Sequence, residues 1–590
     1  MATKDENEIR LSHALSEGEM KATQKRQEKV LMCLKDLGIH CDQNNVPNIV
    51  VLGSGGGLRA MIALLGTLVE LKTQNFLDAV LYLCGVSGST WCMSLLYEDR
   101  KWSENLMSLE KELCKKLNDF PWHIMKAEEY LQESSRDELY SLTDFWASCL
   151  VYQVLKQFDE HELADHREAS ETGINPYPIY AAVDKEQLSE EGENFPGTWF
   201  EFTPHESGYT ALGAFVSTKY FGSEFEKGKM KKRAKKKPIC YMQALWGSAL
   251  GSIEENLKFI RECLQRIFQL QEGISSCAPE SNSDTVMAYQ TALLLLDLEF
   301  CAVSGNDPKE VFKKLLNILS DRAKSASYQL CTEMHNTWAM KTREERMESC
   351  TELDKEIEKE LRVHLGEEGT PEGELQSSHG NSLGPLQDVI RMMFKTIGCV
   401  MTWKWGTTNN FLYKCSNIQP SYLVRNKIIS LIDAGLAINS AYPLVLRAQR
   451  RTDLIISFDF SSGDPFETIK KTATYCQKNS IPFPKIENQE MDENHPSDCY
   501  IFRGDKSCPT VMHFPLFNSV NCSGNTYSMQ LCLCIFAFHI LNFQCHAFWS
   551  PSLLSAAATN GHRRKGTGQP LCAMSRSFAQ ALTYPLRCMS

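Results

Sequence analysis

Residues 83–91, LCGVSGSTW, set a serine among small residues directly after the apolar run of residues 80–83. A strand that ends in such a tight turn and continues into a helix is the local pattern of a nucleophilic serine. At that corner the first amides of the helix have no intrahelical partner and favour negative charge. Ser87 is therefore a candidate nucleophile, although the second glycine of the G-x-S-x-G pattern stands next to it at position 88.

A second glycine turn lies earlier in the chain. Residues 48–52, NIVVL, indicate a buried strand, and residues 53–60, GSGGGLRA, then open a helical pattern. Three glycines in a row can aim their main-chain amides at one point, which suits an oxyanion hole. Arg59, two residues after the last of them, could bind a phosphate group with two parallel hydrogen bonds.

Glycines after a strand also occur at nucleotide sites, but this turn fits those sites poorly. Position 58 is Leu, so G-x-G-x-x-G is not completed, and the chain still indicates helix where a second strand should end in an acid. A Walker loop would need Gly-Lys-Ser/Thr, which is absent from this turn. We therefore favour the oxyanion turn.

The order of these elements predicts an α/β fold. A leading helix is expected over residues 19–37, and each glycine turn joins a strand to a helix, as in a parallel sheet covered by helices. The middle of the chain is rich in helix-spaced apolar residues, and residues 366–385 have the composition of a flexible linker. Strand-like runs return from residue 427. We expect one catalytic domain over residues 1–518, with a helical cap insertion and the linker within about 254–386.

The general base has two candidate types. A triad in hydrolase order would need a histidine after Asp433, and four are available: His495, His513, His539 and His546. None of them stands in a convincing setting. Asp433 ends the apolar run of residues 428–432, so its carboxylate could emerge where the sheet ends, and a desolvated site can raise the pKa of a carboxylate toward a useful base. The sequence leaves the Ser87–Asp433 dyad and the triad both open.

Three stretches together resemble the cytosolic (group IV) phospholipase A2 family. They are residues 54–60 (SGGGLRA), 85–91 (GVSGSTW) and 433–436 (DAGL). Similar stretches lie at residues 199–204, 220–223, 405–411, 443–446 and 457–460. The resemblance covers roughly residues 19–518, and within the family it is strongest to the form that lacks a calcium-binding C2 domain, because only about 50 residues precede the glycine turn.

The resemblance implies a patatin-like catalytic domain with a central, largely parallel sheet, flanking helices and a helical cap. It implies that Ser87 is the nucleophile and Asp433 the base, that Gly56 and Gly57 are the oxyanion donors, and that Arg59 binds the substrate phosphate. The implied activity is calcium-independent hydrolysis of fatty acyl esters of glycerophospholipids and lysophospholipids through an acyl-enzyme. Water or another lysophospholipid would accept the acyl group. No cofactor or metal is implied.

Composition and targeting signals limit where the protein acts. The net charge of −11 argues against nucleic acid as a partner, and the N-terminus has no apolar signal-peptide core. The 23 cysteines are scattered, so we expect reduced thiols. The end of the chain, Arg587-Cys588-Met589-Ser590, lacks a prenylation box. We expect a cytoplasmic protein that is peripherally associated with intracellular membranes, by resemblance the endoplasmic reticulum.

Residues 519–590 depart from the family pattern. They run from an apolar stretch at 529–549 into a tail rich in Ser, Ala and Arg. The apolar stretch is long enough for a membrane span, but its Gln, His and Asn residues weaken that interpretation. We favour a poorly ordered segment or peripheral anchor over a span, and we attribute the tail to an alternative exon or a shifted reading frame. The foreign tail keeps a rival hypothesis open, a non-catalytic lipid-binding or scaffold homologue.

A basic cluster interrupts the otherwise acidic chain. Its members are Lys227, Lys229, Lys231, Lys232, Arg233, Lys235, Lys236 and Lys237. Such a local patch would attract an anionic membrane surface. A solvated loop and a nuclear-localisation-like segment are the alternatives.

Overall fold

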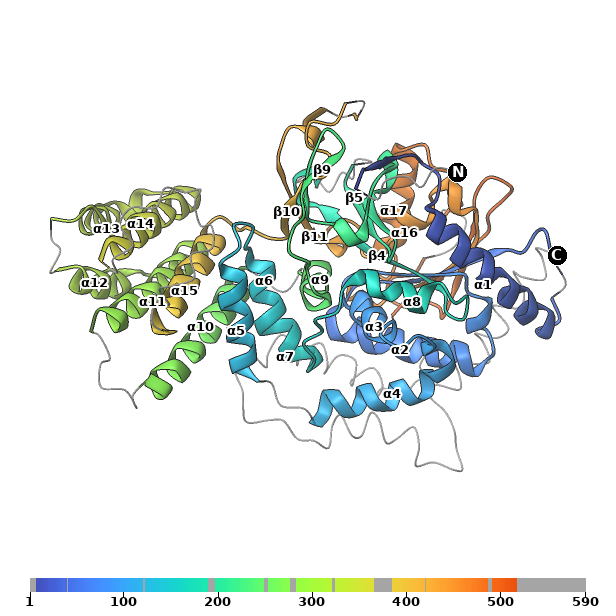
Figure 1. Ribbon diagram of the computed structural model, residues 1–590, viewed down its shortest axis with the longest axis horizontal. Helices are drawn as coiled ribbons and strands as arrows, with labels where there is room; N and C mark the ends of the chain where they lie inside the picture. Colours follow the sequence, from blue (N-terminus) through green and yellow to red (C-terminus); the bar gives the residue numbers. More distant parts are fainter. Residues whose placement is uncertain are drawn as a thin grey trace. The chain divides into compact units, whose positions relative to one another are not determined.

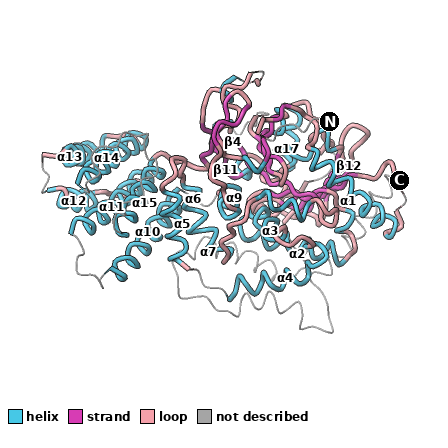
Figure 2. Tube along the Cα trace, in the orientation of Figure 1, coloured by secondary structure: helices cyan, strands magenta, loops and turns pink. Residues whose placement is uncertain are grey.

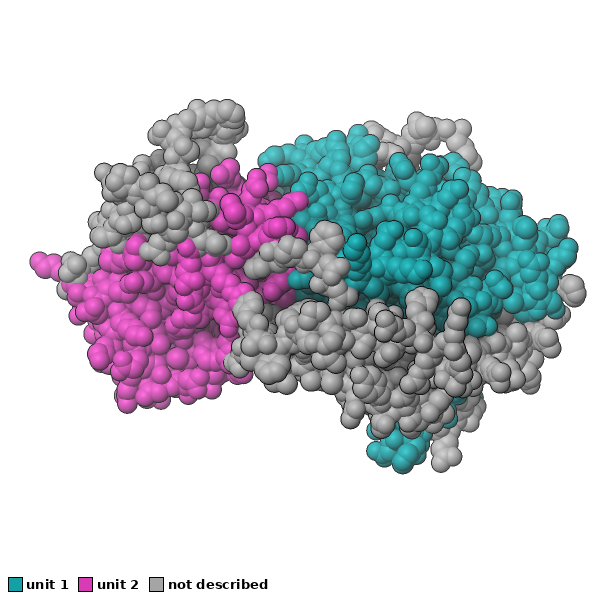
Figure 3. Space-filling view, turned by 90° about the horizontal axis from the view of Figure 1, so that it is seen from below, with its two compact units in different colours: residues 1–121, 154–249, 406–590 teal, residues 122–153, 250–405 magenta. Residues whose placement is uncertain are grey.

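The computed structural model describes residues 7–516, except 40, 120–122, 189–196, 249–252, 276–282, 321–323, 365–384, 417, 420 and 487–490. The chain divides into two compact units, coloured separately in Figure 3. Unit 1 comprises Met1–Pro121, Val154–Ala249 and Gly406–Ser590, and unit 2 comprises Trp122–Gln153 and Leu250–Trp405. The linker expected at 366–385, apart from its last residue, and the tail 519–590 lie outside the described residues.

Unit 1 is built on a 12-stranded sheet. Ten of its strands follow the order β1-β7-β6-β5-β4-β3-β2-β12-β14-β13, and the other two branch from this path, because β11 pairs with β4 and β10 pairs with β11. The strands are β1 (Arg10–Leu11), β2 (Asn48–Gly53), β3 (Tyr82–Gly85), β4 (Tyr177–Asp184), β5 (Trp199–Phe202), β6 (Glu206–Tyr209), β7 (Ala214–Ser217), β10 (Thr407–Asn409), β11 (Ile428–Asp433), β12 (Thr452–Phe458), β13 (Tyr500–Phe502) and β14 (Thr510–Phe514). A separate hairpin joins β8 (Glu224–Glu226) to β9 (Lys229–Lys232).

The sheet is mixed. Its five central strands, β4, β3, β2, β12 and β14, run parallel, whereas β5, β6, β7, β11 and β13 join antiparallel. The α/β fold is confirmed, but the expected largely parallel arrangement holds only at this centre. Parallel strands are buried on both faces, and β2, β3 and β4 are accordingly buried almost throughout.

The helices of unit 1 connect and cover these strands. They are α1 (Glu17–Asp36), α2 (Gly57–Thr73), α3 (Gly88–Leu96), α4 (Trp102–Asp119), α8 (Arg167–Ser170), α9 (Ile239–Trp246), α16 (Tyr442–Val445) and α17 (Glu467–Lys478). Helix α2 directly follows β2, α3 directly follows β3, and the two helices pack against each other (Figure 1). The carboxyl ends of β2 and β3 therefore meet at one edge, which is where α/β sheets hold their sites.

The described residues of unit 2 form helices and no strands (Figure 2). These helices are α5 (Ile124–Ser135), α6 (Leu142–Trp146), α10 (Ile253–Ser275), α11 (Ser283–Ser304), α12 (Lys309–Ile318), α13 (Ala326–Thr337), α14 (Arg343–His364) and α15 (Pro385–Met401). By length and composition α11 could cross a membrane, but 61% of its apolar window is buried inside the structure, as expected of a core helix. Residues 122–153 also belong to this unit, which the sequence did not indicate. One short helix, α7 (Tyr152–Leu155), crosses the boundary in sequence.

The cysteines of the described residues are all free thiols, and most of them are buried.

Candidate active site

Ser87 occupies the corner between β3 and α3. It has φ 51° and ψ −123°, a conformation that few residues other than glycine adopt, and its side chain is 7% exposed. Such strain persists only where the surroundings impose it, and it is typical of functional sites. The serine therefore lies at a strained corner between a strand and a helix, as residues 83–91 predict.

The two glycine turns are in direct contact. A Cβ placed on Gly88 would lie 1.8 Å from the main-chain oxygen of Gly57, so only glycine fits at position 88. The turns are also bonded to each other, because Val86 N donates to Gly53 O at 3.1 Å and Ser89 Oγ donates to Ser54 O at 2.6 Å. This contact explains why a glycine directly follows the serine in this chain.

The earlier turn presents the start of a second helix to the same place. Gly56 has φ 147° and Gly57 has φ 57°, both in the region that side chains disfavour. Helix α2 begins at Gly57 and α3 at Gly88. The first amides of a helix have no intrahelical partner, so two helix N-termini offer donors for a developing oxyanion here.

Arg59 lies beside this turn. Its Nε donates to Phe460 O at 2.9 Å, and its Nη2 is 3.1 Å from the position that a Cβ on Gly56 would take. Only 9% of the residue is exposed. The guanidinium is therefore fixed next to the glycine turn by the loop that follows β12.

Asp433 ends β11 and is 1% exposed. Its Oδ1 accepts a hydrogen bond from Gly435 N at 2.8 Å, and its own amide donates to Ser248 Oγ at 3.0 Å. Strand β11 pairs with β4, which pairs with β3, so its end reaches the edge that carries Ser87. A Cβ on Gly435 would lie 3.1 Å from Asp433 Oδ1 and 3.7 Å from Val86 Cγ1. The loop after Asp433 thus packs against the residue that precedes Ser87.

The histidines proposed for a triad are engaged elsewhere or lie outside the described residues. His513 lies on β14, and strands β12 and β2 separate β14 from β3. Its Nε2 is 2.8 Å from Pro465 O. His495 is exposed, and its Nδ1 is 3.2 Å from Asp492 Oδ2. His539 and His546 lie outside the described residues. Within the described ranges, no cluster of three or more His, Cys, Asp or Glu side chains is arranged to hold a metal.

Two buried cysteines next to the corner are poor rivals as nucleophiles. Burial raises the pKa of the Cys84 thiol, and likewise the pKa of the Cys92 thiol, so neither readily forms the thiolate.

Sequence reasoning did not single out Asn439, Ser461 or Asp459. Asn439 Nδ2 donates to Gly55 O at 3.2 Å and to Ser461 Oγ at 2.6 Å, and Ser461 is bonded in turn to Asp459. Asp459 lies in the stretch 457–460 that resembles the family, whereas the signal for Asn439 and Ser461 was only that they lie in the loops after β11 and β12. Polar residues are common in such loops, so that signal is weak.

Comparison with known proteins shows the family to which the chain belongs. Residues 49–253 match the model of the lysophospholipase catalytic domain family. The chain is also 38% identical over 522 residues to a human protein, and the match covers 88% of each chain. The chain therefore belongs to the cytosolic phospholipase A2 family.

That human relative is cytosolic phospholipase A2 gamma. The mouse protein of the same name is 39% identical over 520 residues, which cover 86% of this chain and 83% of the relative. The solved structure of human GIVD cytosolic phospholipase A2 matches with a TM-score of 0.60 at 22% identity, covering 99% of this chain and 69% of that one. At this identity the solved structure supports the fold alone.

Proposed function

We propose that this chain is a phospholipase A2 and lysophospholipase that hydrolyses fatty acyl esters of glycerophospholipids through a Ser87–Asp433 dyad. The observation that carries the proposal is the strained Ser87 corner packed directly on the Gly55–Gly57 turn. Membership of the cytosolic phospholipase A2 family supports hydrolysis of phospholipid as the chemistry. The dyad and the finer substrate range are our inference.

In the first half-reaction, Ser87 Oγ attacks the ester carbonyl while its proton passes to the Asp433 carboxylate. The carbonyl oxygen becomes an oxyanion that the amides of Gly56 and Gly57 stabilise. The intermediate collapses, the carbon–oxygen bond to the glycerol breaks, and the leaving alkoxide takes the proton from Asp433. Arg59 binds the phosphate of the substrate beside the turn. An acyl-enzyme and a free lysophospholipid or glycerophosphodiester result.

In the second half-reaction, water attacks the acyl carbonyl and gives its proton to Asp433. The Ser87 ester bond breaks, Ser87 recovers a proton, and a fatty acid leaves. A lysophospholipid hydroxyl in the place of water would give acyl transfer instead. None of these steps uses calcium, so we expect activity to persist in a chelator.

The deciding experiment incubates the full chain with a phospholipid labelled in its acyl chain. Ser87→Ala and Asp433→Asn should each lower the rate of fatty acid release by at least about a thousandfold, because residues of a catalytic unit fail together. The matched controls are Ser94→Ala and Asp453→Asn, which should keep the wild-type rate. Ser94 lies further along α3, and Asp453 lies near the start of β12, at the end of that strand away from the site.

Three other outcomes would each decide against the dyad. Equal hydrolysis by the wild type, Ser87→Ala and Asp433→Asn would reject the dyad. No hydrolysis by the wild type would support the scaffold hypothesis. A His513→Gln variant that is folded but inactive would restore the triad.

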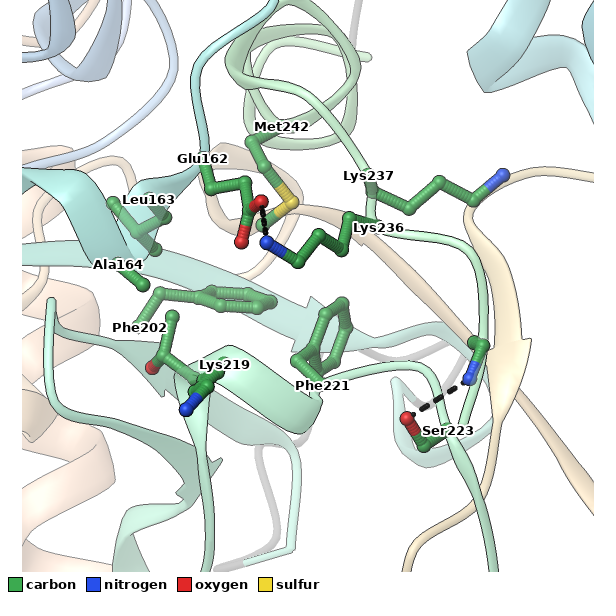
Figure 4. A pocket seen from close by; sticks show the side chains of 12 residues that line it. Glu162, Leu163, Ala164, Phe202, Lys219, Phe221, Ser223, Lys236, Lys237 and Met242 are labelled. Carbon is green, nitrogen blue, oxygen red and sulfur yellow. Dashed lines mark hydrogen bonds and ion pairs between the residues drawn. The ribbon is translucent and has the colours of Figure 1, made fainter. Parts of the chain in front are cut away.

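We also propose that the protein is cytoplasmic and contacts membranes, including the endoplasmic reticulum, through the β8–β9 hairpin. Its lysines, including Lys229, Lys231 and Lys232, are exposed to solvent. Lys229 and Lys232 pair with Glu8 and Glu224, at 3.2 and 3.6 Å, but their side chains stay 72% and 77% exposed. Lys236 pairs with Glu162 at the rim of a small pocket lined by Phe202 and Phe221, and its side chain is 50% exposed (Figure 4). Because solvent screens such exposed pairs, the hairpin lysines can still exchange them for an anionic surface.

Vesicles containing phosphatidylserine would test this contact. Changing Lys229, Lys231 and Lys232 to Gln should weaken binding in low salt by about 100-fold, since each basic residue near an anionic surface contributes about 1 kcal/mol. Changing Lys470, Lys471 and Lys478 of α17 to Gln is the control. Equal binding by both triple variants would reject the contact.

A further inference from the structure

The Gly55–Gly57 turn has no side chains of its own to hold it. A turn of three glycines is conformationally permissive, yet oxyanion donors act only if they are already in place when charge develops. Asn439 binds both main-chain groups of Gly55: Gly55 N donates to Asn439 O at 3.0 Å, and Asn439 Nδ2 donates to Gly55 O at 3.2 Å. The turn is therefore fixed from outside.

The orientation of the Asn439 amide is itself set by a chain of hydrogen bonds. Asp459 Oδ1 accepts from the Ser461 amide at 2.9 Å and from Ser461 Oγ at 2.5 Å. Because the Ser461 hydroxyl proton points to that carboxylate, its oxygen can accept from Asn439 Nδ2 at 2.6 Å. Gly55 O, which also accepts from Ser54 Oγ at 3.2 Å, and Ser461 Oγ both act as acceptors toward Asn439, so the NH2 end of the amide faces them.

The oxygen end of the same amide lies at the junction of the catalytic segments. Asn439 Oδ1 is 2.4 Å from the position of a Cβ on Gly55 and 2.9 Å from that of a Cβ on Gly435. Ser87 Cβ is 3.0 Å from the same position on Gly55. Asn439 thus contacts the glycine turn and the loop that begins at Asp433, next to Ser87.

The loop of residues 459–461 holds the rest of the turn as well. Phe460 N donates to Ser54 Oγ at 2.7 Å, and Phe460 O accepts from Arg59 Nε at 2.9 Å. The Asp459 amide donates to Phe514 O at 2.8 Å, which ties the loop to β14. One short loop therefore supports Ser54, Arg59 and, through Asn439, Gly55.

We infer that Asn439, oriented by Ser461 and Asp459, is a positioning residue that holds the oxyanion turn in register with Ser87 and the Asp433 loop. This inference rests on the proposed function. Asn439 has no role in bond making; it keeps the amides of Gly56 and Gly57 where the oxyanion forms. Its loss should slow acylation and leave substrate binding unchanged.

The test compares Asn439→Asp with Ser461→Ala and Ser461→Thr. Asn439→Asp keeps the shape of the side chain and removes the NH2 donor, so it should lower kcat by about 10- to 100-fold, the cost of a displacement of about 1 Å. KM should stay within about twofold. Ser461→Ala should lower kcat less, and Ser461→Thr, which restores the hydroxyl, should recover it. The matched control is Asn479→Asp, because Asn479 Nδ2 also donates to a main-chain oxygen, Tyr475 O at 2.9 Å, away from the site.

A second readout follows covalent reaction with a fluorophosphonate probe. The rate of Ser87 labelling should fall in parallel with kcat in Asn439→Asp, because labelling also develops charge on an oxygen facing the turn. Thermal unfolding checks that the variants are folded. If Asn439→Asp fails to fold, equal kcat for Ser461→Ala and Ser461→Thr overturns the inference.

Failure of the inference and failure of the proposed function give different results. An active wild type and an inactive Ser87→Ala, together with a fully active Asn439→Asp, would overturn only the positioning role. A folded wild type that neither hydrolyses phospholipid nor reacts with the probe would overturn the proposed function, and the positioning role with it.

Discussion

A buried ion-pair network in unit 1 and two buried carboxyls in unit 2 hold charge in opposite ways. In unit 1 the fully buried guanidinium of Arg450 lies between two carboxylates, with Nε 2.9 Å from Glu19 Oε1 and Nη1 2.8 Å from Glu201 Oε2. Arg447 adds a second cation, 3.1 Å from Glu201 Oε1. Burial alone would raise the pKa of Glu201, but Arg450 and Arg447 hold it below its ordinary value. These bonds join α1 and β5 to the segment before β12.

In unit 2 two carboxyls are buried on neighbouring helices without such cations. Glu299 of α11 and Asp354 of α14 each have one oxygen that finds no hydrogen-bond partner among the described residues. Burial, with a smaller contribution from Asp354, raises the pKa of Glu299 to about 8. Burial and then Glu358, partly offset by Lys355, raise the pKa of Asp354 to about 7.

This difference gives the Glu201 network and the Glu299–Asp354 pair opposite dependence on pH. A carboxyl whose pKa is lowered by folding, such as Glu201, stabilises the folded state at pH values above its pKa in the unfolded chain. That stabilisation is lost as the pH falls through its pKa in the folded state. A raised pKa, as at Glu299, means that the folded state holds a proton that the unfolded state releases. The contribution of Glu299 and Asp354 is therefore greatest in acid and is lost between their ordinary values and about pH 8.

The largest expected effect comes from breaking the paired network. Glu201→Gln leaves two buried guanidinium groups with too little negative charge, which costs about 3–5 kcal/mol of unfolding free energy. Denaturant unfolding of unit 1 measures it. Glu17→Gln, at an exposed pair with Lys21 on α1, is the control and should leave the midpoint unchanged. A wild-type midpoint for Glu201→Gln would contradict the view that the network stabilises the unit.

A smaller effect is expected from the unpaired carboxyls. Protection of α11 and α14 from amide hydrogen exchange should decrease from pH 6 to pH 9 in the wild type, after correction for intrinsic rates. In the wild type, the free energy of opening should fall over this pH range. Glu299→Gln and Asp354→Asn should each make that fall smaller, by about 1–3 kcal/mol. A pH dependence that both variants retain would show that other groups cause it.

The smallest effect is expected at a half-exposed pair in unit 2. Arg261 of α10 forms a bidentate ion pair with Asp297 of α11, and Asp297 raises the pKa of Arg261. Solvent screens such a pair, so Asp297→Asn should cost no more than about 1 kcal/mol. Thermal unfolding in 0.05 and 0.5 M salt checks this, since the wild-type advantage should shrink at high salt. If Asp297→Asn lowered the unfolding free energy as much as Glu201→Gln, solvent exposure would not explain why a surface ion pair stabilises less than the buried network.

Much of the site was predictable because its parts are short and local. The runs at residues 48–52 and 80–83 become β2 and β3, and the glycines that follow them become the turns of the site. Asp433 ends β11, as its apolar run indicates. The antiparallel half of the sheet was not predictable, because β5, β6 and β7 have short sequences whose pairing depends on contacts across the sheet.

By itself the sequence determined the two glycine turns, the serine between them, and the family to which the chain belongs. These features follow from local backbone geometry, where small residues permit conformations that others do not. Only the tertiary structure decided that Gly88 must lie against Gly57 O, that Asn439 orients the turn, and that Arg450 lies between Glu19 and Glu201. These contacts join segments up to several hundred residues apart, and local sequence patterns do not encode which distant groups will meet.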